Sequence, residues 1–537
     1  MKRRTPHVLP ALILLATMPF SHVVADVVLP TVLGSHMVLQ RDAAVPIWGE
    51  AAPGEAVRVG IAEQIHETVA DTNGAWRVTL DPMDASFAPI ELTVTASNSL
   101  VLTNILVGEV WLCSGQSNMQ WPLSRVRDGD VEIASASNPA MRLFQVDRKT
   151  VLAPRVNVNG SWQSCSPDAA KGFSGVGYLF GRDLQPILGV PVGLIDSSWG
   201  GTPAEAWTRL ETLSESEPMQ VTLEQWETRL AGHEASMKTW QLAADAWQAK
   251  KAAGEKVGRH PRKPGSPLNP HRPGILADSM LAPIVPFAIK GSIWYQGESN
   301  ASRHEQYRTL LPLMIADWRE WWGIDNLAFG IVQLAGFRQP KELPSDDTWP
   351  HLRDAQLHTH RTTPHTGLAV ITDIGESNNI HPGNKSDVGR RLARWALTDV
   401  YGLEFVGSGP MPCEHSIEGG KVTITFDHVD KGLKIMNGGD PMGFTLAGDD
   451  AVWHPATATL TNKKTIVLSS DAVPMPVAAR YAWQNNPIDA NVFNSSTLPL
   501  TPFRTDAWPK DYVPVVADES EEDIGNGDSL MEKSGVS

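Results

Sequence analysis

Five apolar runs, separated by stretches with helix-like spacing, constrain the fold of this chain more than any other feature. Short apolar runs bounded by turn residues favour buried strands. Strands that alternate with helices favour a largely parallel sheet with helices on both faces. The helix-like stretches are 177–188 and 305–322, and the runs are 105–113, 190–196, 289–295, 327–334 and 368–373. The sequence therefore predicts an α/β domain over residues 106–400.

Polar or glycine-rich turns follow four of these runs. In open parallel sheets the reactive groups gather outside the carboxyl ends of the strands, so we expect these turns to lie together. Paired glycines in the second turn let backbone N–H groups approach a ligand closely. In chain order the turns carry Ser117; Gly200 and Gly201; Gln296, Glu298 and Asn300; and His381, which precedes an apolar helix-like stretch from Val388.

Acyl transfer needs a nucleophile, a base that removes its proton, and donors aimed at the developing oxyanion. Each of these turns can supply one such part. Ser117 is the candidate nucleophile, and His381 stands out among 16 histidines because of its position after a strand.

The 537 residues predict about three domains. Short β-type runs between Pro-Gly, Asn-Gly and Asp-Pro turns predict a small β-sandwich over residues 26–105, which either binds glycan or braces the catalytic domain. A second β-domain is expected over residues 401–510. Residues 511–537 are acidic and poor in apolar side chains, which predicts a disordered tail.

The amino terminus resembles a secretory signal peptide. Basic residues precede an apolar run over residues 8–18, and small residues up to Ala25 suit cleavage. No later stretch approaches the roughly 20 apolar residues of a membrane span. Residues 1–25 are therefore expected to direct export, to the periplasm or the extracellular space, without membrane anchoring.

Composition excludes several partners. A formal charge of −15 disfavours nucleic acid and anionic membranes. Three cysteines allow at most one disulfide, and Cys113 reads as a buried structural thiol. His358, His360 and His365 lie close in sequence, but no cysteine or carboxylate completes a metal-site spacing around them. No cofactor-binding fingerprint is present, so neither a metal nor a cofactor is predicted.

An insert near residues 209–275 is the most individual part of the chain. Apolar residues at a three-four spacing from Trp226 to Trp247 predict one long amphipathic helix. This helix is expected to lie across the catalytic domain, with a dimer contact or an aromatic rim over the substrate as alternatives. The stretch 250–272, rich in basic residues and proline, predicts an extended loop that is either merely solvated or contacts an anionic sugar.

Several long motifs, in order, resemble the sialate O-acetylesterase family of the SGNH hydrolase superfamily. They are MVLQR at residue 37, GEVWLCSGQSNMQWPL at 108, PVGLIDSSWGGTPAEAW at 191, FAIKGSIWYQGESNA at 287 and IHPGNKSDVGRRLA at 380. The resemblance covers residues 27–508. It implies a flavodoxin-type three-layer α/β/α catalytic domain flanked by β-sandwich-like domains, and an O-acetylated glycan as substrate.

The same resemblance implies that Ser117 is the nucleophile and His381 the general base, with an acetyl-serine intermediate. It assigns the oxyanion hole to the Ser117 N–H, to Gly200 or Gly201, and to a side-chain amide of Gln296 or Asn300. A strict overlay places Glu298 where the superfamily has an asparagine, which leaves the identity of the amide open.

A second departure concerns the third member of a catalytic triad. Relatives commonly carry an aspartate two or three residues before the histidine, where this chain has Asn379 and Asn378. The orienting group is therefore Asp373, Glu376, Glu298 or a backbone carbonyl, or the site is a Ser-His dyad.

These features predict a secreted O-acetylesterase that acts on sialic acid or on a plant or algal polysaccharide such as xylan or xyloglucan. A catalytically silent glycan-binding protein is the alternative from another class. A homo-oligomer is compatible with the sequence.

Overall fold

The computed structural model describes residues 26–342 and 344–513. The predicted signal peptide, residues 1–25, and residues 514–537 of the predicted tail lie outside this part of the chain. Among the described residues, no helix combines the length and the apolar character that crossing a membrane requires.

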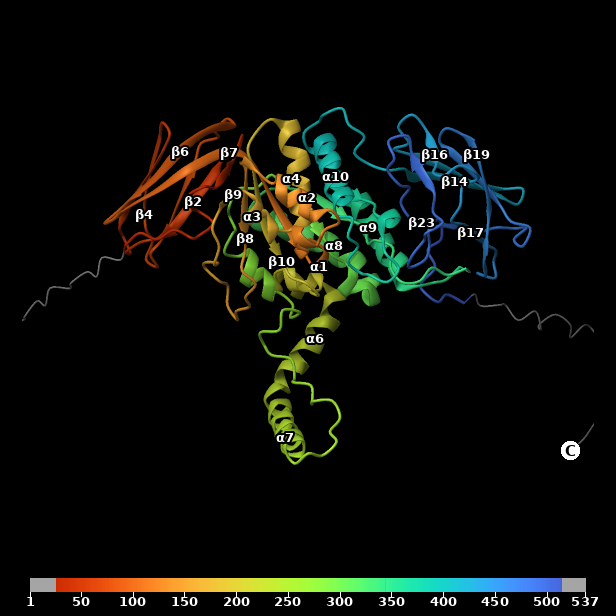
Figure 1. The fold of residues 1–537 in the computed structure, drawn as a ribbon, viewed down its shortest axis with the longest axis horizontal. Coiled ribbons are helices and arrows are strands. Elements are labelled where there is room, and N and C mark those ends of the chain that lie inside the picture. Colours follow the sequence, from red (N-terminus) through yellow and green to blue (C-terminus); the bar gives the residue numbers. More distant parts are fainter. Residues whose placement is uncertain (1–25, 343, 514–537) are drawn as a thin grey trace, which may run out of the picture.

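A central sheet of parallel strands occupies the middle of the molecule (Figure 1). Its order is β13-β12-β11-β7-β10-β8, and β9 pairs antiparallel with β8 at one edge. The strands are β7 (Ser99–Gly115), β8 (Asn138–Gln145), β9 (Gln163–Cys165), β10 (Val192–Ser198), β11 (Gly291–Tyr295), β12 (Ala328–Val332) and β13 (Thr366–Ala369).

All five predicted runs are strands of this sheet. The last strand ends at Ala369, earlier than predicted, because the chain turns into the short helix η5 (Thr372–Ile374). Sequence analysis missed β8 and β9. Only the middle of β8 is apolar and buried, so the strand has no uniform apolar pattern.

Helices cover both faces of the central sheet. On one face lie α4 (Gly175–Leu188) and α10 (Ser386–Trp395); on the other lie α8 (His304–Trp322) and α9 (Thr348–Thr362). Trp111 and Cys113 of β7 pack with the α4 and α10 side chains, while Leu112 packs with those of α8. This alternation follows from the two-residue side-chain period of a strand.

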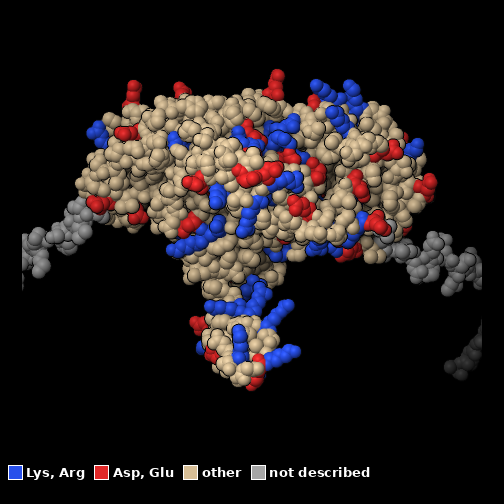
Figure 2. All heavy atoms as spheres, viewed as in Figure 1, with Lys and Arg blue, Asp and Glu red and all other residues tan. Residues whose placement is uncertain are grey.

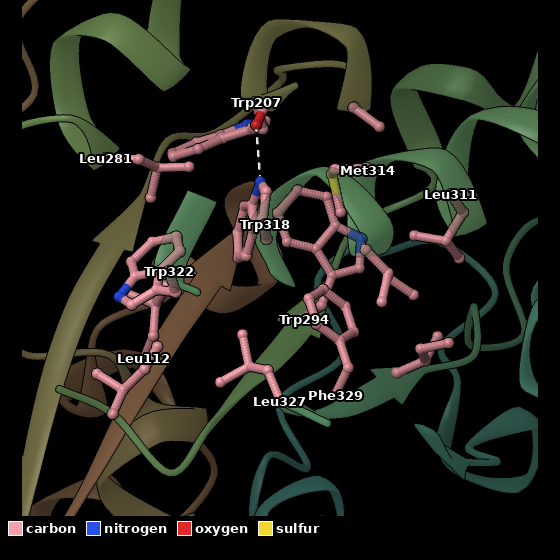
Figure 3. Close-up of a cluster of buried hydrophobic side chains, with 14 of the residues drawn as sticks. Leu112, Trp207, Leu281, Trp294, Leu311, Met314, Trp318, Trp322, Leu327 and Phe329 are labelled. Carbon is pink, nitrogen blue, oxygen red and sulfur yellow. Dashed lines mark hydrogen bonds between the residues drawn. The ribbon is translucent and has the colours of Figure 1, made fainter. Parts of the chain in front are cut away.

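The core on the α8 face is unusually aromatic (Figure 3). Trp294, Trp318 and Phe329 are fully buried there, and Trp318 Nε1 donates to the Trp207 carbonyl at 2.9 Å. Burial of each large apolar side chain contributes about 2 kcal/mol, so this cluster fixes α8 firmly against β11.

Shorter helices connect these elements. They are α1 (Ser117–Gln120), η1 (Leu123–Arg125), α2 (Gly129–Ser135), α3 (Pro167–Lys171), η2 (Ala204–Trp207), α5 (Leu210–Ser214), η3 (Ala277–Leu281), η4 (Glu298–Arg303) and η6 (Ala396–Val400).

The amino-terminal β region continues directly into the central sheet, because β7 belongs to both. The boundary predicted between residues 105 and 106 thus falls inside one continuous strand. This region contains β1 (Val38–Gln40), β2 (Val45–Glu50), β3 (Ala56–Ile61), β4 (Gln64–Val69), β5 (Ala75–Leu80) and β6 (Ser86–Thr95).

The carboxy-terminal β region lies on the opposite side of the central sheet (Figure 1). It contains β14 (Met411–Glu418), β15 (Lys421–Asp427), β16 (Leu433–Ile435), β17 (Phe444–Ala447), β18 (Trp453–Pro455), β19 (Thr457–Asn462), β20 (Thr465–Ser469), β21 (Ala478–Tyr481), β22 (Val492–Asn494) and β23 (Phe503–Arg504).

Buried polar contacts join this region to the central domain. The fully buried Arg353 of α9 donates to the carbonyls of Gln484 and Asn485, each at 2.8 Å. Asn486 Nδ2 donates to Ser377 Oγ at 2.9 Å. The carboxy-terminal region therefore supports the loop that carries His381.

The insert differs from the prediction in two ways. It forms two helices, α6 (Glu217–Ala231) and α7 (His233–Ala252), which meet at Gly232, where glycine weakens helical continuity. The helices also project away from the body instead of lying across the catalytic domain (Figures 1 and 2). We call residues 217–272 the arm.

The apolar seam of α7 packs on the arm's own loop. Trp240 Nε1 donates to the Pro261 carbonyl at 3.1 Å, and Trp247 Nε1 donates to the Gly258 carbonyl at 2.8 Å. The apolar residues at three-four spacing therefore pack on the loop of the arm. Sequence periodicity predicts an apolar helix face but does not identify what covers it.

Candidate active site

Ser117 stands at the carboxyl edge of the central sheet, in the first turn after β7. Gly115 ends β7 with φ +134°, and a side chain there would meet the Tyr295 carbonyl oxygen at 2.2 Å. Only glycine suits this conformation and this close approach. The turn then starts α1 at Ser117, which leaves the hydroxyl half-buried at the sheet edge.

His381 lies directly against this hydroxyl, although it is 264 residues away in the sequence. His381 Nε2 and Ser117 Oγ are 2.9 Å apart. The Trp121 ring stacks on the imidazole, with centroids 4.6 Å apart and planes 15° from parallel. The structure thus brings together the two predicted catalytic residues in hydrogen-bonding geometry.

The pKa of His381 is lowered by its partial burial and by the nearby positive charge of Lys385. Both effects disfavour the imidazolium form. His381 is therefore neutral at neutral pH, the state in which Nε2 can accept the Ser117 proton.

The turn after β10 lies beside Ser117, where a side chain on Gly200 would meet Ser117 Cβ at 3.2 Å. The Gly200 N–H donates to Gln120 Oε1 at 2.6 Å, so this predicted oxyanion donor is occupied by a side-chain amide. Among the described residues, the N–H groups of Ser117 and Gly201 form no hydrogen bond. These two groups are available to a substrate oxygen.

The amides of Gln296 and Asn300 are both fully buried and engaged within the protein. Gln296 Nε2 donates to Asn300 Oδ1 at 2.7 Å, and Asn300 Nδ2 donates to Glu205 Oε2 at 3.0 Å. Neither residue hydrogen bonds with Ser117 or His381 in the described part of the chain. Their visible role is to hold the turn after Gly201, since Asn300 Oδ1 also accepts from the Ala204 N–H at 3.0 Å.

Each of the three carboxylates predicted to orient His381 has other partners. Asp373 forms a bidentate pair with Arg391, with both contacts at 2.7 Å. Glu376 accepts from the Gly383 N–H at 2.8 Å and from Asn379 Nδ2 at 3.0 Å. Glu298 accepts from Asn118 Nδ2 at 2.6 Å. None of the three hydrogen bonds with the His381 ring.

The two asparagines before His381 also form no hydrogen bond with its ring. Asn378 Oδ1 accepts from Gln339 Nε2 at 2.7 Å. Asn379 Oδ1 accepts from the His381 backbone N–H at 3.0 Å, which fixes the backbone but not the imidazole. Within the described residues, His381 Nδ1 has no hydrogen-bond partner.

Comparison with known proteins places this site in a family. Residues 277–398 match the family model of carbohydrate esterases described as sialic acid-specific acetylesterases. The sialate O-acetylesterase of Homo sapiens is 30% identical over 88% of this chain and 91% of its own length. The Mus musculus sialate O-acetylesterase is 29% identical over 88% and 93%. The chain belongs to the sialate O-acetylesterase family. It is therefore a carboxylic ester hydrolase.

A solved structure extends this likeness to the fold of the esterase. A carbohydrate acetylesterase from Xanthomonas citri superimposes with a TM-score of 0.76 at 36% identity, covering 90% of this chain and all of that one. The architecture of a mixed α/β core with separate β-sheet regions is therefore shared with a carbohydrate esterase.

Sequence reasoning missed four residues of the candidate site: Gln120, Trp121, Asn118 and Lys385. All four lie inside the motifs that carry the family resemblance, but residue type alone gave them no role. A fully buried lysine such as Lys385 is rare, and its burial is visible only in three dimensions.

The histidines weighed as metal ligands have other surroundings. His360 Nδ1 lies 3.3 Å from Thr366 Oγ1, and burial lowers the pKa of His360 to about 4. Among residues 26–342 and 344–513, no group of three or more histidine, cysteine or acidic side chains is placed to hold a metal ion. The three cysteines are free, with Cys113 and Cys165 buried.

Proposed function

We propose that this esterase removes O-acetyl groups from sugar hydroxyls through an acetyl-serine intermediate formed on Ser117. The observation that carries the proposal is the 2.9 Å contact between Ser117 Oγ and His381 Nε2 at the carboxyl edge of the sheet. A serine hydroxyl at its ordinary pKa is a weak nucleophile, and an adjacent neutral imidazole activates it.

In the first half-reaction, Ser117 Oγ attacks the acetyl carbonyl carbon while His381 Nε2 takes the serine proton. The tetrahedral oxyanion lies against the free N–H groups of Ser117 and Gly201. When it collapses, the bond to the sugar oxygen breaks and His381 returns the proton to that oxygen. The deacetylated sugar leaves, and the acetyl group remains on Ser117.

In the second half-reaction, a water molecule takes the place of the sugar. His381 removes its proton as the water oxygen attacks the acetyl carbonyl. Collapse of this second intermediate breaks the bond to Ser117 Oγ, which regains the proton from His381. Acetate is released and the resting site returns.

Gly200 joins the oxyanion hole in this proposal once the Gln120 amide moves away from its N–H. The amides of Gln296 or Asn300 remain further candidates, although both are engaged in the described structure. Each well-placed donor to the oxyanion contributes about 3 kcal/mol to transition-state stabilisation.

The proposed fold of the catalytic domain is SGNH-like and of the flavodoxin type. The strand order supports it: when β8 and the edge strand β9 are set aside, the sequence positions read 2-1-3-4-5 across β10, β7, β11, β12 and β13. We also propose that β-sandwich-like domains at 26–105 and 401–510 flank a catalytic domain at 106–400. Residues 1–25 are proposed to direct export.

The test is acetate release by purified protein from a chromogenic acetate ester. Ser117→Ala should abolish turnover above background, and Ser124→Ala, an exposed serine seven residues away, should retain the wild-type rate. A fluorophosphonate probe should add mass to the wild type and not to Ser117→Ala. Equal rates in wild type and Ser117→Ala would overturn the serine mechanism.

The substrate sugar is proposed as O-acetylated sialic acid, because two relatives that cover most of the chain are named sialate O-acetylesterases. Acetylated xylan or xyloglucan is the alternative, supported by the likeness to a carbohydrate acetylesterase. Acetate release from a panel of all three decides between them by the ratio of kcat/KM values.

The alternative of a catalytically silent glycan-binding protein conflicts with membership of the esterase family, and a single observation speaks for it. Among the described residues, His381 Nδ1 has no carboxylate partner of the kind that normally stabilises an imidazolium. Binding of acetylated glycans without any acetate release would support this function, whereas turnover that depends on Ser117 would exclude it.

A further inference from the structure

A buried polar cluster lies directly behind the nucleophile and takes no part in the proposed proton transfers. It consists of Asn118, Lys385 and Glu298. The side chains of Asn118 and Lys385 are essentially fully buried, and the Glu298 Oε2 atom is buried without a hydrogen-bond partner. Burying a charged group costs free energy unless the group is paired. A cluster of this kind next to Ser117 therefore suggests a function.

Asn118 is the centre of the cluster. Its Nδ2 donates to Glu298 Oε1 at 2.6 Å and to the Ile380 carbonyl at 3.0 Å, while its Oδ1 accepts from Lys385 Nζ at 2.5 Å. These partners fix the orientation of the amide, because a flipped side chain would set its oxygen against two acceptors.

The contacts of Asn118 connect both halves of the catalytic pair. Asn118 follows Ser117 directly in α1, and the carbonyl that it binds belongs to the residue before His381. Lys385 stands at the start of α10, four residues after His381, and Glu298 starts η4. One amide therefore holds the turn of the nucleophile against the loop of the base.

We infer that Asn118, held by Lys385 and Glu298, positions His381 on Ser117 in place of the aspartate that this chain lacks. The inference rests on the proposed function. In this arrangement the imidazole is fixed by Ser117 at Nε2, by Trp121 on its face and by its own backbone, and no acceptor within residues 26–342 and 344–513 binds Nδ1.

Three charged groups outside the cluster, Glu376, Arg127 and Arg125, face this part of the site. Lys385 Nζ lies 5.2 Å from the centre of the Tyr295 ring and is attracted by the carboxylates of Glu298 and Glu376. Glu376 in turn faces Arg127 at 3.8 Å, and the Arg125 guanidinium lies 5.5 Å from the centre of the Trp121 ring. Of these charges, Lys385 is the one that lowers the pKa of His381.

This charge gives the cluster a measurable signature. Burial lowers the pKa of Lys385 to about 7, against the attraction of Glu298, so the lysine is mostly charged in the acidic range where His381 titrates. The positive charge keeps His381 neutral to a lower pH. The acidic limb of kcat/KM reports the pKa of this base in the free enzyme.

The test compares wild type with Lys385→Met on a small acetate ester between pH 4.5 and 8.5. We expect kcat to fall at least ten-fold because Asn118 loses its anchor, and the acidic limb to move to higher pH because His381 loses a positive neighbour. Asn118→Ala should lower kcat by a similar factor with KM changed less than two-fold. The control Lys290→Met removes a lysine that lies over the Tyr401 ring, outside the site. It should change neither kcat nor the pH of the acidic limb.

Lys385→Met leaves the Glu298 carboxylate buried without a cation, which endangers folding. The double variant Lys385→Met with Glu298→Gln removes both charges and keeps the measurement possible. If the acidic limb of kcat/KM lies at the same pH in the double variant as in the wild type, the inference is overturned, whether or not the plateau value falls. A purely structural lysine would affect only the plateau value. The proposed function is tested separately, because it fails if the wild type releases no acetate or if Ser117→Ala remains active.

Discussion

At the scale of single residues, His381 Nδ1 has no partner in the described part of the chain, and Asn379 instead holds the backbone of His381. Its side chain donates to Glu376 Oε2 at 3.0 Å and to the His381 carbonyl at 2.8 Å, and accepts from the His381 N–H. Asn379 thus closes a small turn around His381. The Asn379 Nδ2 atom faces only oxygen acceptors, so an amide fits this position and a carboxylate does not.

Replacing each of the two neighbouring asparagines with aspartate should therefore affect kcat differently. Asn379→Asp places a second carboxylate against Glu376, whose pKa is held below its usual range, despite partial burial, by the Gly383 N–H, Asn379 and Arg127. We expect kcat to fall at least ten-fold, equivalent to about 1.4 kcal/mol in the barrier. Asn378→Asp, at a position whose contact with Gln339 is exposed, should stay within two-fold of wild type.

The measurement is kcat on a small ester, with thermal unfolding as the check of folding. The Asn379→Asp loss should shrink below pH 5, measured relative to wild type at each pH, because protonation of either carboxylate relieves the repulsion. A strong loss in Asn378→Asp would show that this side chain reaches the site in solution.

The sequence could predict that Ser117 and His381 stand at the same sheet edge, because each follows an apolar strand. It could not predict the contacts of Asn118, whose partners Glu298 and Lys385 are 180 and 267 residues away. The direction of a side-chain amide depends on such distant groups. Local pattern carries no information about them.

At the scale of elements, the pair α4 and α10 decides how the His381 loop is held. Gly389 of α10 lies against α4, where a side chain would meet Leu179 Cβ at 2.7 Å and the Phe180 backbone nitrogen at 2.8 Å. Glycine weakens an isolated helix, yet here it permits close helix packing. Lys385 and His381 precede α10 directly, so the spacing of these helices affects the site.

Gly389→Ala should destabilise the protein although alanine is the better helix former. The added methyl must separate α10 from α4, and overpacking of this kind costs about 2 kcal/mol. We expect Tm to fall by about 2 °C and kcat to fall as well, because the His381 loop moves with α10. Gly172→Ala, at an exposed position in an ordinary conformation with nothing within 4 Å, is the matched control and should change neither. An unchanged Tm in Gly389→Ala would contradict the close packing.

Element prediction succeeded where tertiary partners agreed with the local pattern. The two predicted helices appear as α4 and α8 with nearly the expected bounds, since their apolar faces pack on the sheet. The arm shows the opposite case. The apolar spacing from Trp226 to Trp247 continues through Gly232, but the helix breaks there, and the seam faces Pro261 instead of the catalytic domain.

At the scale of the whole molecule, the two β regions and the arm relate differently to the central sheet. The amino-terminal region shares β7 with that sheet, and the carboxy-terminal region is tied to the His381 loop through Asn486 and Arg353. The sequence marked these regions by composition, yet it could not show that β7 continues through the predicted boundary, because the apolar pattern becomes continuous only from Ile105.

The arm, in contrast, is largely self-contained. Its seam is covered by its own loop, and Lys251 and Lys263 lie over the rings of Trp247 and Trp240, 5.0 and 5.3 Å from their centres. The arm joins the body at its base, where Gln306 Nε2 donates to Thr222 Oγ1 at 2.8 Å and Thr150 Oγ1 donates to the Leu268 carbonyl at 2.8 Å.

Replacing residues 229–265 with a ten-residue Gly/Ser linker should therefore leave the chemistry intact. Such a linker spans about 17 Å on average. We expect kcat on a small acetate ester to stay within two-fold of wild type and Tm within about 3 °C, because Ser117, His381 and the core of the sheet lose no contact. His271, whose Nε2 lies 3.9 Å from where a side chain on Gly201 would begin, remains in this variant. A large loss of small-ester turnover would show that the arm shapes the Gly201 turn from a distance, and His271→Ala in the full chain would then have to reproduce that loss.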